Sequence, residues 1–455
     1  MTSSTAISPP PQLTARQWRA MAAILVSIAL ATLDIAIANT ALPAIAADLN
    51  TPPAAAVWII NAYQLAAVAT LLPLAALGGV IGPRKIYLGG IIVFVLASGL
   101  CSLADSLGTL IAARVLQGLG ASAIMSVNTA LIGQIFSREH LGRGVGLNAL
   151  VVGTSFSIGP TVASLVLSVA SWPWLFAINL PIGLFAVAFA WNSLPTSHSR
   201  AEQPFDYKTA LLNTITFGAL IFALGQAAQL ASMFSVLAGL GVFLIAGALM
   251  LRRERHHPAP MFPLDLLKRP MFALSALTAF CVFSAQGLAF VSLPFFFEHT
   301  LGLDPIQTGF LMTPWSVVVA AIGPFAGRLS DRYSPGVLCS IGLAILSTGM
   351  LSLLWMPDHP STGEIVARMI YCGIGFGFVQ APNLKAIMTS APKERASGAS
   401  GTVASSRLIG QATGAALVAL CFGLVGEGGP SLALAVGAGF AAAGCVASSL
   451  RMVAR

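Results

Sequence analysis

The stretch ATLDIAIANTALPAIAADLN, residues 31–50, continues an apolar run that begins near Met21 and carries one acid, Asp34, within it. A run of this length and composition can cross a bilayer as a helix. An ionised carboxylate near the bilayer centre costs about 2.5–3.5 kcal/mol on insertion scales. Asp34 is therefore a candidate functional residue in a membrane helix.

The composition of the whole chain agrees with this first helix. Of the 455 residues, 56% are hydrophobic and 8% are charged, whereas a soluble domain carries about 25% charged residues. We therefore expect an all-α polytopic membrane protein. Fourteen apolar runs predict spans at 20–42, 57–77, 86–104, 108–132, 144–168, 173–192, 209–228, 233–251, 271–296, 306–326, 336–356, 363–386, 397–424 and 430–450.

The charges between these spans predict the orientation of the chain. Connections on one side of the predicted membrane hold the basic residues Arg84, Lys85, Arg138, Arg143, Arg200, Lys208, Arg252, Arg253, Arg255, Lys268, Arg269, Arg328, Arg332, Lys393 and Arg395. The opposite connections contain neither Lys nor Arg and hold Asp48, Asp105, Glu298, Asp304, Asp358, Glu364 and Glu427. Basic loops remain cytoplasmic, so both termini are predicted to be cytoplasmic in a multi-pass protein of the bacterial inner membrane.

The same asymmetry limits the partners of the chain. The net charge of +8 belongs to the cytoplasmic face, where it meets anionic membrane lipid and not nucleic acid. The six cysteines all fall inside spans, without a spacing that suggests a metal site or a disulfide. We expect a monomer with no cofactor and no metal.

The two outer groups of six spans resemble each other in sequence. The segment beginning at Ala75 matches GRLSDRYS, which begins at Gly327, and Arg114 matches Arg368 in the same order. Duplicated halves related by an axis along the membrane normal are a transporter architecture with a midplane substrate site. We expect a cytoplasmic tail (1–19), an N-terminal six-helix bundle (20–192), linkers with two inserted helices (193–270), a C-terminal six-helix bundle (271–450) and a cytoplasmic C-terminus (451–455).

Four motifs in order resemble the major facilitator superfamily, in its fourteen-helix drug:proton antiporter branch. They are LDIAIANTALP in the first span, RVLQGLGASA from Arg114, GTSFSIGP from Gly153 and SWPWLFAINLPIG from Ser171. The resemblance covers nearly the whole chain. It implies two pseudo-symmetric six-helix bundles and proton-coupled export of drugs.

Two positions depart from the family pattern. Gly79 stands where the loop after the second span normally has an acid, while the second copy of that loop, Gly327 to Arg332, keeps Asp331. An acid here can face the positive end of a helix from the other half. Asp331, with Gly327 and Arg332, is predicted to latch the cytoplasmic side shut against the fifth span, near residues 138–142. At the end of the helix-5 motif, Ala163 and Ser164 replace a glycine pair.

Asp34 and Arg114 lie at similar depths in their spans. Each is nine residues from a predicted outer helix end, which corresponds to about 13 Å. Burial raises and a nearby guanidinium lowers the proton affinity of a carboxylate, so a movable pair suits proton coupling. The alternative interpretation is a static ion pair that only fixes helix packing.

Other polar residues in the spans are candidates for the substrate cavity. Arg407 lies about 18 Å into its helix, too deep for its guanidinium to reach the interface readily. Arg368 is shallower, and a local pair with Glu364 accounts for it. We also assign to the cavity Asn39, Asn61, Gln64, Gln286 and Gln411. Interhelical hydrogen bonds are the alternative role for these side chains.

The fifth span contains residues that determine the shape and packing of its backbone. Gly153 and Gly159 allow close helix approach, and Pro160 removes a helix hydrogen bond and bends the helix. The resemblance ties this motif to antiport.

Three functions are compatible with the sequence. The first is proton-coupled export of lipophilic, often cationic, drugs or toxic compounds by alternating access. The second is transport of an anionic or neutral metabolite, which the excess of embedded Arg over Asp favours. The third is a membrane sensor or enzyme, although neither a nucleophile–base pair nor a Walker-type nucleotide loop is visible.

Overall fold

The computed structural model describes residues 14–136, 141–195, 205–228, 233–254, 264–357, 359–392 and 396–453. Every regular element in these ranges is helical. The long helices are α1 (Ala15–Thr40), α4 (Trp58–Ile81), α5 (Pro83–Ser102), α6 (Leu107–Ile135), α7 (Leu141–Leu167), α9 (Asn179–Ser193), α10 (Tyr207–Ala228), α11 (Met233–Glu254), α13 (Pro270–Phe295), α14 (Pro305–Leu329), α15 (Pro335–Leu354), α16 (Thr362–Ser390), α17 (Ala396–Val425) and α18 (Gly429–Leu450). Short helical segments join them: α2 (Leu42–Asp48), α3 (Pro53–Ala56), α8 (Pro173–Ala177), α12 (Leu264–Leu267) and the π-helical turn η1 (Phe296–Thr300).

The long helices match the predicted membrane spans. Thirteen stretches of the described residues are long and apolar enough to cross a membrane. The last of these, Gly401–Leu450, contains both α17 and α18, which the turn Gly426–Gly428 separates. When these two helices are counted separately, each of the fourteen predicted spans has its helix, including the inserted pair.

Local sequence explains where several helices begin. Thr14, Ser106 and Ser361 each cap a helix by accepting a hydrogen bond from the backbone three residues later, in a reciprocal capping box. Between α4 and α5, Gly82 has a φ of 97°, a conformation that glycine adopts without the strain of a side chain. Pro83 then starts α5 at a position where its missing N–H has no helical partner to lose.

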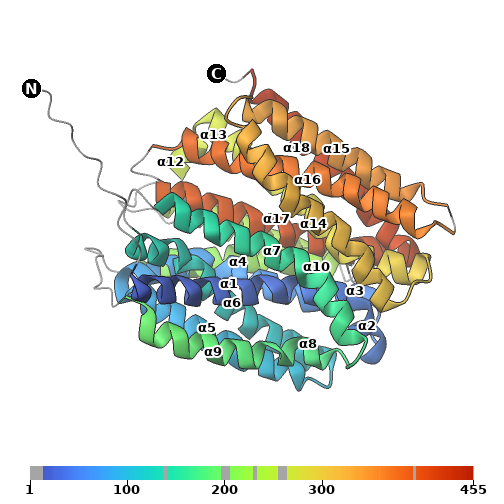
Figure 1. Ribbon diagram of the computed structural model, residues 1–455, viewed down its shortest axis with the longest axis horizontal. Coiled ribbons are helices and arrows are strands. Elements are labelled where there is room, and N and C mark those ends of the chain that lie inside the picture. The colour runs from blue at the N-terminus through green and yellow to red at the C-terminus, as the bar shows by residue number, and fades with distance from the viewer. Residues whose placement is uncertain are drawn as a thin grey trace, which may run out of the picture.

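The three largest buried apolar clusters organise the helices, which run roughly parallel in Figure 1. One lies within the N-terminal helices around Tyr87 and Phe94, and another within the C-terminal helices around Trp315 and Phe376. The third draws on both halves at the end that carries α2 and α3. We call it the apolar seal and define it by Ile37, Leu42, Val291, Phe295 and Phe422.

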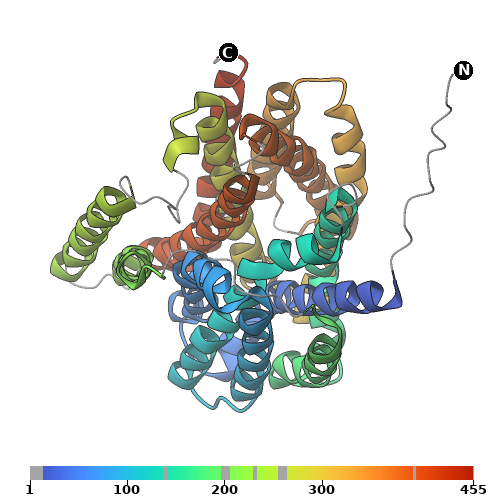
Figure 2. The same ribbon diagram turned by 90° about the vertical axis from the view of Figure 1, so that its left-hand side faces the viewer.

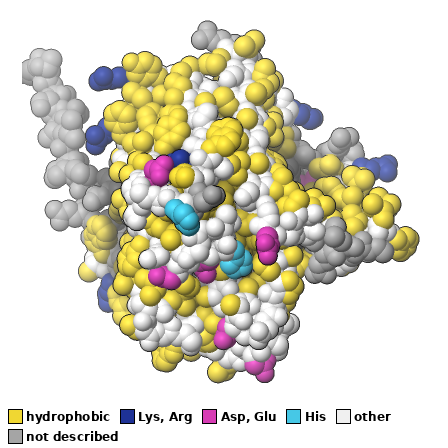
Figure 3. All heavy atoms as spheres, turned by 90° about the vertical axis from the view of Figure 1, so that its right-hand side faces the viewer, with side chains coloured by type: hydrophobic (Ala, Val, Ile, Leu, Met, Phe, Trp, Pro, Cys, Tyr) yellow, Lys and Arg dark blue, Asp and Glu magenta, His cyan; other side chains and the backbone are white. Residues whose placement is uncertain are grey.

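The two ends of the molecule differ in charge. The basic face is the end that carries Arg16, Arg84, Arg328 and Lys385, together with α12, and the acidic face is the end that carries Asp48, Asp105, Asp304 and Glu364. Figure 3 views the acidic face, where Asp, Glu and His side chains are spread across the surface and Lys and Arg lie mostly at its margin. The apolar seal lies nearer this acidic face.

The inserted helices α10 and α11 form a hairpin at the side of the molecule. Helix α10 packs against both α4 and α17, and α11 lies outside α10 (Figure 2). Gly225 of α10 is close to the indole of Trp58, where an added Cβ would lie 1.8 Å from Cζ2. The hairpin therefore covers the seam between the two halves on the α4–α17 side.

Candidate functional site

A cavity of about 270 Å³ lies between the two halves. Helices α1, α6, α7, α13, α14, α16 and α17 contribute its walls. On α1 its lining ends at Ile35, and Ile37, two residues further along, belongs to the apolar seal. The cavity therefore lies between the seal and the basic face.

The cavity wall combines rings, amides and one cation. Five aromatic side chains line it, from helices of both halves: Phe156, Phe283, Phe290, Trp315 and Phe376. The polar lining side chains are Thr32, Asn128, Thr129, Asn148, Ser157, Gln286, Ser316, Gln380, Asn383, Arg407 and Gln411. Such a surface suits an organic molecule with a large apolar part and a few polar groups.

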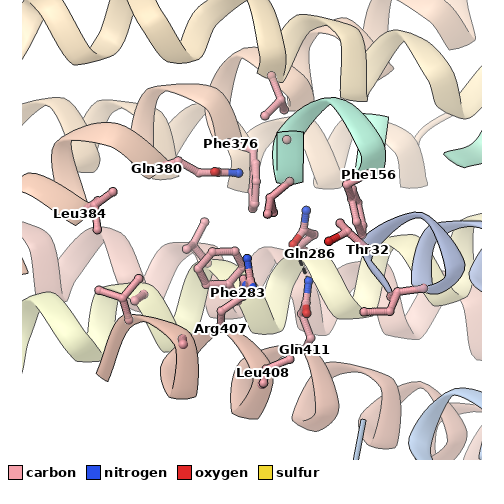
Figure 4. Close-up of a pocket in the computed structure, with 18 of the residues that line it drawn as sticks. Thr32, Phe156, Phe283, Gln286, Phe376, Gln380, Leu384, Arg407, Leu408 and Gln411 are labelled. Atoms are coloured by element: carbon pink, nitrogen blue, oxygen red, sulfur yellow. Dashed lines mark hydrogen bonds between the residues drawn. The ribbon is translucent and has the colours of Figure 1, made fainter. Parts of the chain in front are cut away.

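Three of the six predicted cavity residues line this cavity. Gln286, Arg407 and Gln411 project into the same space (Figure 4), and Gln411 Nε2 donates a hydrogen bond of 3.1 Å to Gln286 Oε1. Arg407 has neither an ion pair nor a hydrogen bond to another residue in the described part of the chain. It is a cation in the cavity wall without a partner among the residues that the structure describes.

The other three residues are buried outside the cavity lining in this conformation, so their assignment to the cavity stays a prediction. Asn39 follows the α1 residues of the apolar seal, and Asn61 and Gln64 lie on the part of α4 that packs against α6. That contact is close, because a Cβ on Gly118 of α6 would lie 2.3 Å from the Tyr63 carbonyl oxygen. Both side-chain polar atoms of Asn61 lack a hydrogen-bond partner in the described part of the chain.

Asp34 and Arg114 form a buried ion pair, as their matched depths predict. Arg114 Nη1 lies 2.5 Å from Asp34 Oδ2, and both side chains are 1% exposed. The guanidinium also donates to the Ile59 carbonyl oxygen at 3.2 Å and lies 4.3 Å from the ring centre of Tyr63. A buried pair of this kind is stable only when hydrogen bonds satisfy its remaining atoms.

Sequence reasoning missed the residues that complete this cluster. Gln117 Nε2 and Asn179 Nδ2 each donate to Asp34 Oδ1 at 2.8 Å, and Gln117 also donates to Ser98 Oγ at 2.9 Å. Gln117 and Asn179 belong to the motifs that carry the family resemblance, one turn after Arg114 and at the start of α9. An amide deep in an apolar span was the signal that could have identified them.

Asp34 is close to the cavity in sequence but does not line it. Thr32 and Ile35, on either side of it in α1, line the cavity, whereas Asp34 is 2% exposed and faces the N-terminal helices. A movement or rotation of α1 would therefore affect both the cavity wall and the ion pair.

The α7 motif lies at the contact between the halves. An added Cβ on Gly159 would lie 2.2 Å from Ala36 Cβ of α1, so close approach requires glycine here. Pro160 lies inside α7, and its carbonyl oxygen would be 2.6 Å from a Cβ on Gly309 of α14. Gly153 differs, because it lines the cavity and has open space around its missing Cβ.

Hydrogen bonds join α7 to α14 across the same contact. Ser157 Oγ donates to the Ser316 carbonyl oxygen at 2.8 Å, and the hydroxyls of Thr161 and Thr313 are 2.8 Å apart. The α7–α14 seam therefore combines a close backbone approach with polar contacts.

The loop after α14 is exposed at the basic face. Asp331 Oδ1 lies 2.6 Å from Lys385 Nζ of α16, with the Asp331 side chain 72% exposed. Arg332 is exposed, and a Cβ on Gly327 would make only an ordinary contact at 3.6 Å. Of the predicted latch position at 138–142, residues 138–140 lie outside the described part, so the latch stays a prediction.

Arg368 pairs with Glu364 at 3.5 Å, as the local alternative predicts.

Known proteins resemble this chain over most of its length. It is 45% identical to the uncharacterized transporter YebQ of Escherichia coli over 96% of each chain. It is 30% identical to the methylenomycin A resistance protein of Streptomyces coelicolor, over 95% of this chain and 92% of that protein. It is 28% identical to the riboflavin transporter RibZ of Clostridioides difficile, over 84% of this chain and 82% of that protein.

The family model for the Major Facilitator Superfamily matches residues 24–415. That range runs from α1 into α17 and contains the cavity and the Asp34 cluster. The chain belongs to the Major Facilitator Superfamily, and it is a membrane transporter.

Proposed function

We propose that this transporter is a proton-coupled antiporter that exports lipophilic compounds by alternating access. The observation that carries the proposal is the buried Asp34–Arg114 pair, on a helix that also forms the cavity wall. An acid inside a membrane protein that pairs with a base is typical of proton pathways. The fourteen-helix drug:proton branch is the subgroup that the sequence motifs favour.

Proton binding is coupled to transport if the Asp34–Arg114 pair and the cavity wall depend on the same helix. Protonation of Asp34 removes its negative charge, and the positive charge of Arg114 is then left without compensation. A rearrangement of α1 that relieves this charge would also move Thr32 and Ile35 in the cavity wall. Proton binding and a change of the cavity would thereby be linked.

We also propose an orientation and a setting. The basic face is cytoplasmic, by the distribution of Lys and Arg, so the conformation described here faces inward with its apolar seal toward the outside. The protein acts as a monomer in the bacterial inner membrane, surrounded by lipid. Its substrates are small molecules.

The related proteins support two kinds of substrate. The resistance protein for methylenomycin A favours export of a toxic compound, and the riboflavin transporter favours a metabolite. The motifs alone suggest a cationic drug, but the described residues of the cavity lining include no acidic side chain that could pair with a cation. An anionic or neutral compound is therefore the candidate that the cavity favours over a cation.

Proton coupling can be tested by flux in proteoliposomes with an imposed pH gradient. Asp34→Asn should abolish proton-driven transport, while Asp105→Asn, the same change at an exposed acid of the acidic face, should leave it intact. The double variant Asp34→Asn/Arg114→Gln should recover thermal stability, because both charges are removed, but not coupling. Undiminished proton-driven flux in folded Asp34→Asn would remove Asp34 from the mechanism.

A further inference from the structure

We infer that the transported compound is an amphipathic organic anion whose carboxylate or similar acidic group binds Arg407. Its apolar body would lie against the aromatic side chains of the cavity. This inference rests on the proposed transport function and narrows it to one substrate charge. It follows from the charges in the cavity, the other arginines within the helical bundle, the hydrogen-bond donors and the aromatic wall.

The cavity lining carries charge of one sign. Arg407 is the one charged side chain among the described residues that line it, and that lining holds neither Asp nor Glu. Asp34, the acid on the nearest wall helix, faces away and is already paired with Arg114. A cation entering this space would meet repulsion without compensation, whereas an anion would neutralise Arg407.

The other arginines within the helical bundle show how this protein compensates a guanidinium. Arg114 is paired with Asp34, and Arg368 with Glu364. Arg451 donates to Ser275 Oγ at 3.1 Å and to Asn383 Oδ1 at 2.8 Å. Arg407 has no such partner among the residues that the structure describes, although it lies deep in α17. The missing acceptor is therefore best supplied by a ligand.

Further hydrogen-bond donors surround the same space. Gln411 donates to Gln286 Oε1, and the Gln286 amide nitrogen, which points away from Gln411 in Figure 4, has no acceptor in the described part of the chain. Trp315 also lines the cavity, and its Nε1 is buried without a hydrogen-bond partner among the described residues. A guanidinium presents a rigid fork of donors that matches a carboxylate. The site thus offers donors where an anion needs them.

The aromatic wall and the volume of the cavity indicate the size and polarity of the rest of the ligand. The rings of Phe156 and Phe290 are 5.0 Å apart, those of Phe290 and Trp315 5.4 Å, and those of Phe283 and Phe376 6.0 Å. Helices of both halves contribute these rings. The volume of about 270 Å³ lies just below the range of ligand pockets, which is roughly 300–1,000 Å³. A compact aromatic or aliphatic acid fits this description.

The test compares compounds that differ only in charge. Purified full-length protein in a neutral detergent is titrated at pH 7.5 with benzene, naphthalene and anthracene scaffolds, each as the carboxylate, the carboxamide and the aminomethyl cation. Hydrogen bonds to charged groups are worth about 1.5–3 kcal/mol, so the carboxylate should bind about tenfold or more tightly than its carboxamide on at least one scaffold.

Variants of Arg407 identify the residue responsible. Arg407→Gln should abolish the carboxylate preference, so that the carboxylate binds no more tightly than its carboxamide. Arg407→Lys should keep part of it, because the charge remains but the fork is lost. Arg16→Gln makes the same change on the exposed basic face and should retain the wild-type preference. Circular dichroism and the unfolding temperature confirm that each variant is folded.

The outcomes separate this inference from the proposed function. Equal binding of the three charge forms, tightest binding of the cations, binding of none of the nine compounds, or an unchanged preference in Arg407→Gln would overturn the inference. Proton-driven flux is measured separately in proteoliposomes. An equilibrium preference for carboxylates that depends on Arg407, without proton-driven flux, would uphold the inference on substrate charge and overturn the proton-coupled antiport.

Discussion

The carbonyl oxygen of Ala69 on α4 accepts a hydrogen bond of 2.8 Å from Asn213 Nδ2 on the inserted helix α10. In a continuous helix this oxygen would accept from the N–H four residues later, but that residue is Pro73, which has no N–H. Thr214 Oγ1 donates to the same oxygen at 3.2 Å. The inserted hairpin is therefore attached to α4 at the position that the proline leaves open.

Asn213→Leu should destabilise the protein by about 1–3 kcal/mol, because it removes a principal donor to a buried carbonyl oxygen. The measurement is thermal unfolding in detergent. Adding Pro73→Ala in the Asn213→Leu background should recover part of the loss, since it supplies a backbone N–H for Ala69. Asn192→Leu, at an exposed asparagine of α9, is the matched control. If Pro73→Ala gives no recovery, Asn213 stabilises the hairpin in some other way.

Gly159→Ala and Gly153→Ala should have opposite effects, although both glycines lie in α7. The new methyl group at 159 would lie 2.2 Å from Ala36 Cβ, and such overpacking costs about 1–3 kcal/mol. At 153 the methyl group meets open space, and alanine in a helix is favoured over glycine by about 0.5–1 kcal/mol. The unfolding temperatures of the two variants test this. Similar values would show that α1 can move away from α7 at little cost.

Asp331→Asn and Lys385→Gln should shift the two facing states in opposite directions. In the conformation described here Lys385 holds Asp331 within the C-terminal half. An exposed pair of this kind is worth about 0–1 kcal/mol, while a carboxylate at a helix N-terminus gains about 0.3–1 kcal/mol and up to about 2 when partly buried. Asp331→Asn should therefore favour the present conformation by up to about tenfold and slow turnover, because 1.4 kcal/mol corresponds to tenfold.

Spectroscopic labels at the basic-face ends of α6 and α16 measure this shift as a change in the distance distribution. Lys385→Gln should populate the closed basic face slightly more, because Asp331 is released to act as the latch. Gly79→Asp should do the same by restoring the second acid, and a Cβ at 79 meets open space. An unchanged distribution in Asp331→Asn would reduce the motif to a tight turn with a solvated acid.

The contact between α10 and α11 within the inserted hairpin should weaken in acid. Partial burial by itself raises the pKa of Asp206, but hydrogen bonds from Thr209 and Arg253 and the charge of Arg253 outweigh it and lower the pKa to about 2. The folded-state pKa lies below the ordinary value of about 3.9. Ionised Asp206 therefore stabilises the fold above about pH 4, and this contribution is lost as the pH falls toward 2.

Asp206→Asn checks the pH dependence directly. Its unfolding temperature should lie below that of the wild type at pH 6, and the difference should shrink as the pH falls from 4 toward 2. Asp105→Asn, at an exposed acid, serves as the control. A difference between wild type and Asp206→Asn that is the same at all pH values would contradict the role of the charge.

Sequence reasoning predicted depth along the membrane better than direction around a helix. The apolar runs located the helices, and equal depth predicted the contact of Asp34 with Arg114, because depth follows from residue counts at 1.5 Å per residue. Which face of a helix looks into the cavity depends on packing with its neighbours. For that reason Asn61 turned out to be buried outside the cavity lining while Gln286 lines the cavity.

The partners of the buried acid were also beyond the sequence. The amides Gln117 and Asn179 lie 83 and 145 residues from Asp34 in the chain, and only the folded arrangement brings them to its carboxylate. The depth of Arg407 predicted that it faces the cavity. That Arg407 lacks a partner among the described residues decides the proposed substrate charge. This could not be predicted from the sequence, because it depends on the positions of the neighbouring side chains.

The one-sided hairpin also determines how the surrounding bilayer acts on the protein. Helix α10 covers the α4–α17 seam, whereas none of the described helices covers the α7–α14 seam in the same way. When the two halves move relative to each other, the α4–α17 seam therefore slides against protein, whereas the α7–α14 seam moves against lipid. Lateral pressure and acyl-chain length should act directly on the α7–α14 seam, and a lipophilic molecule dissolved in the membrane meets an uncovered seam on that side alone.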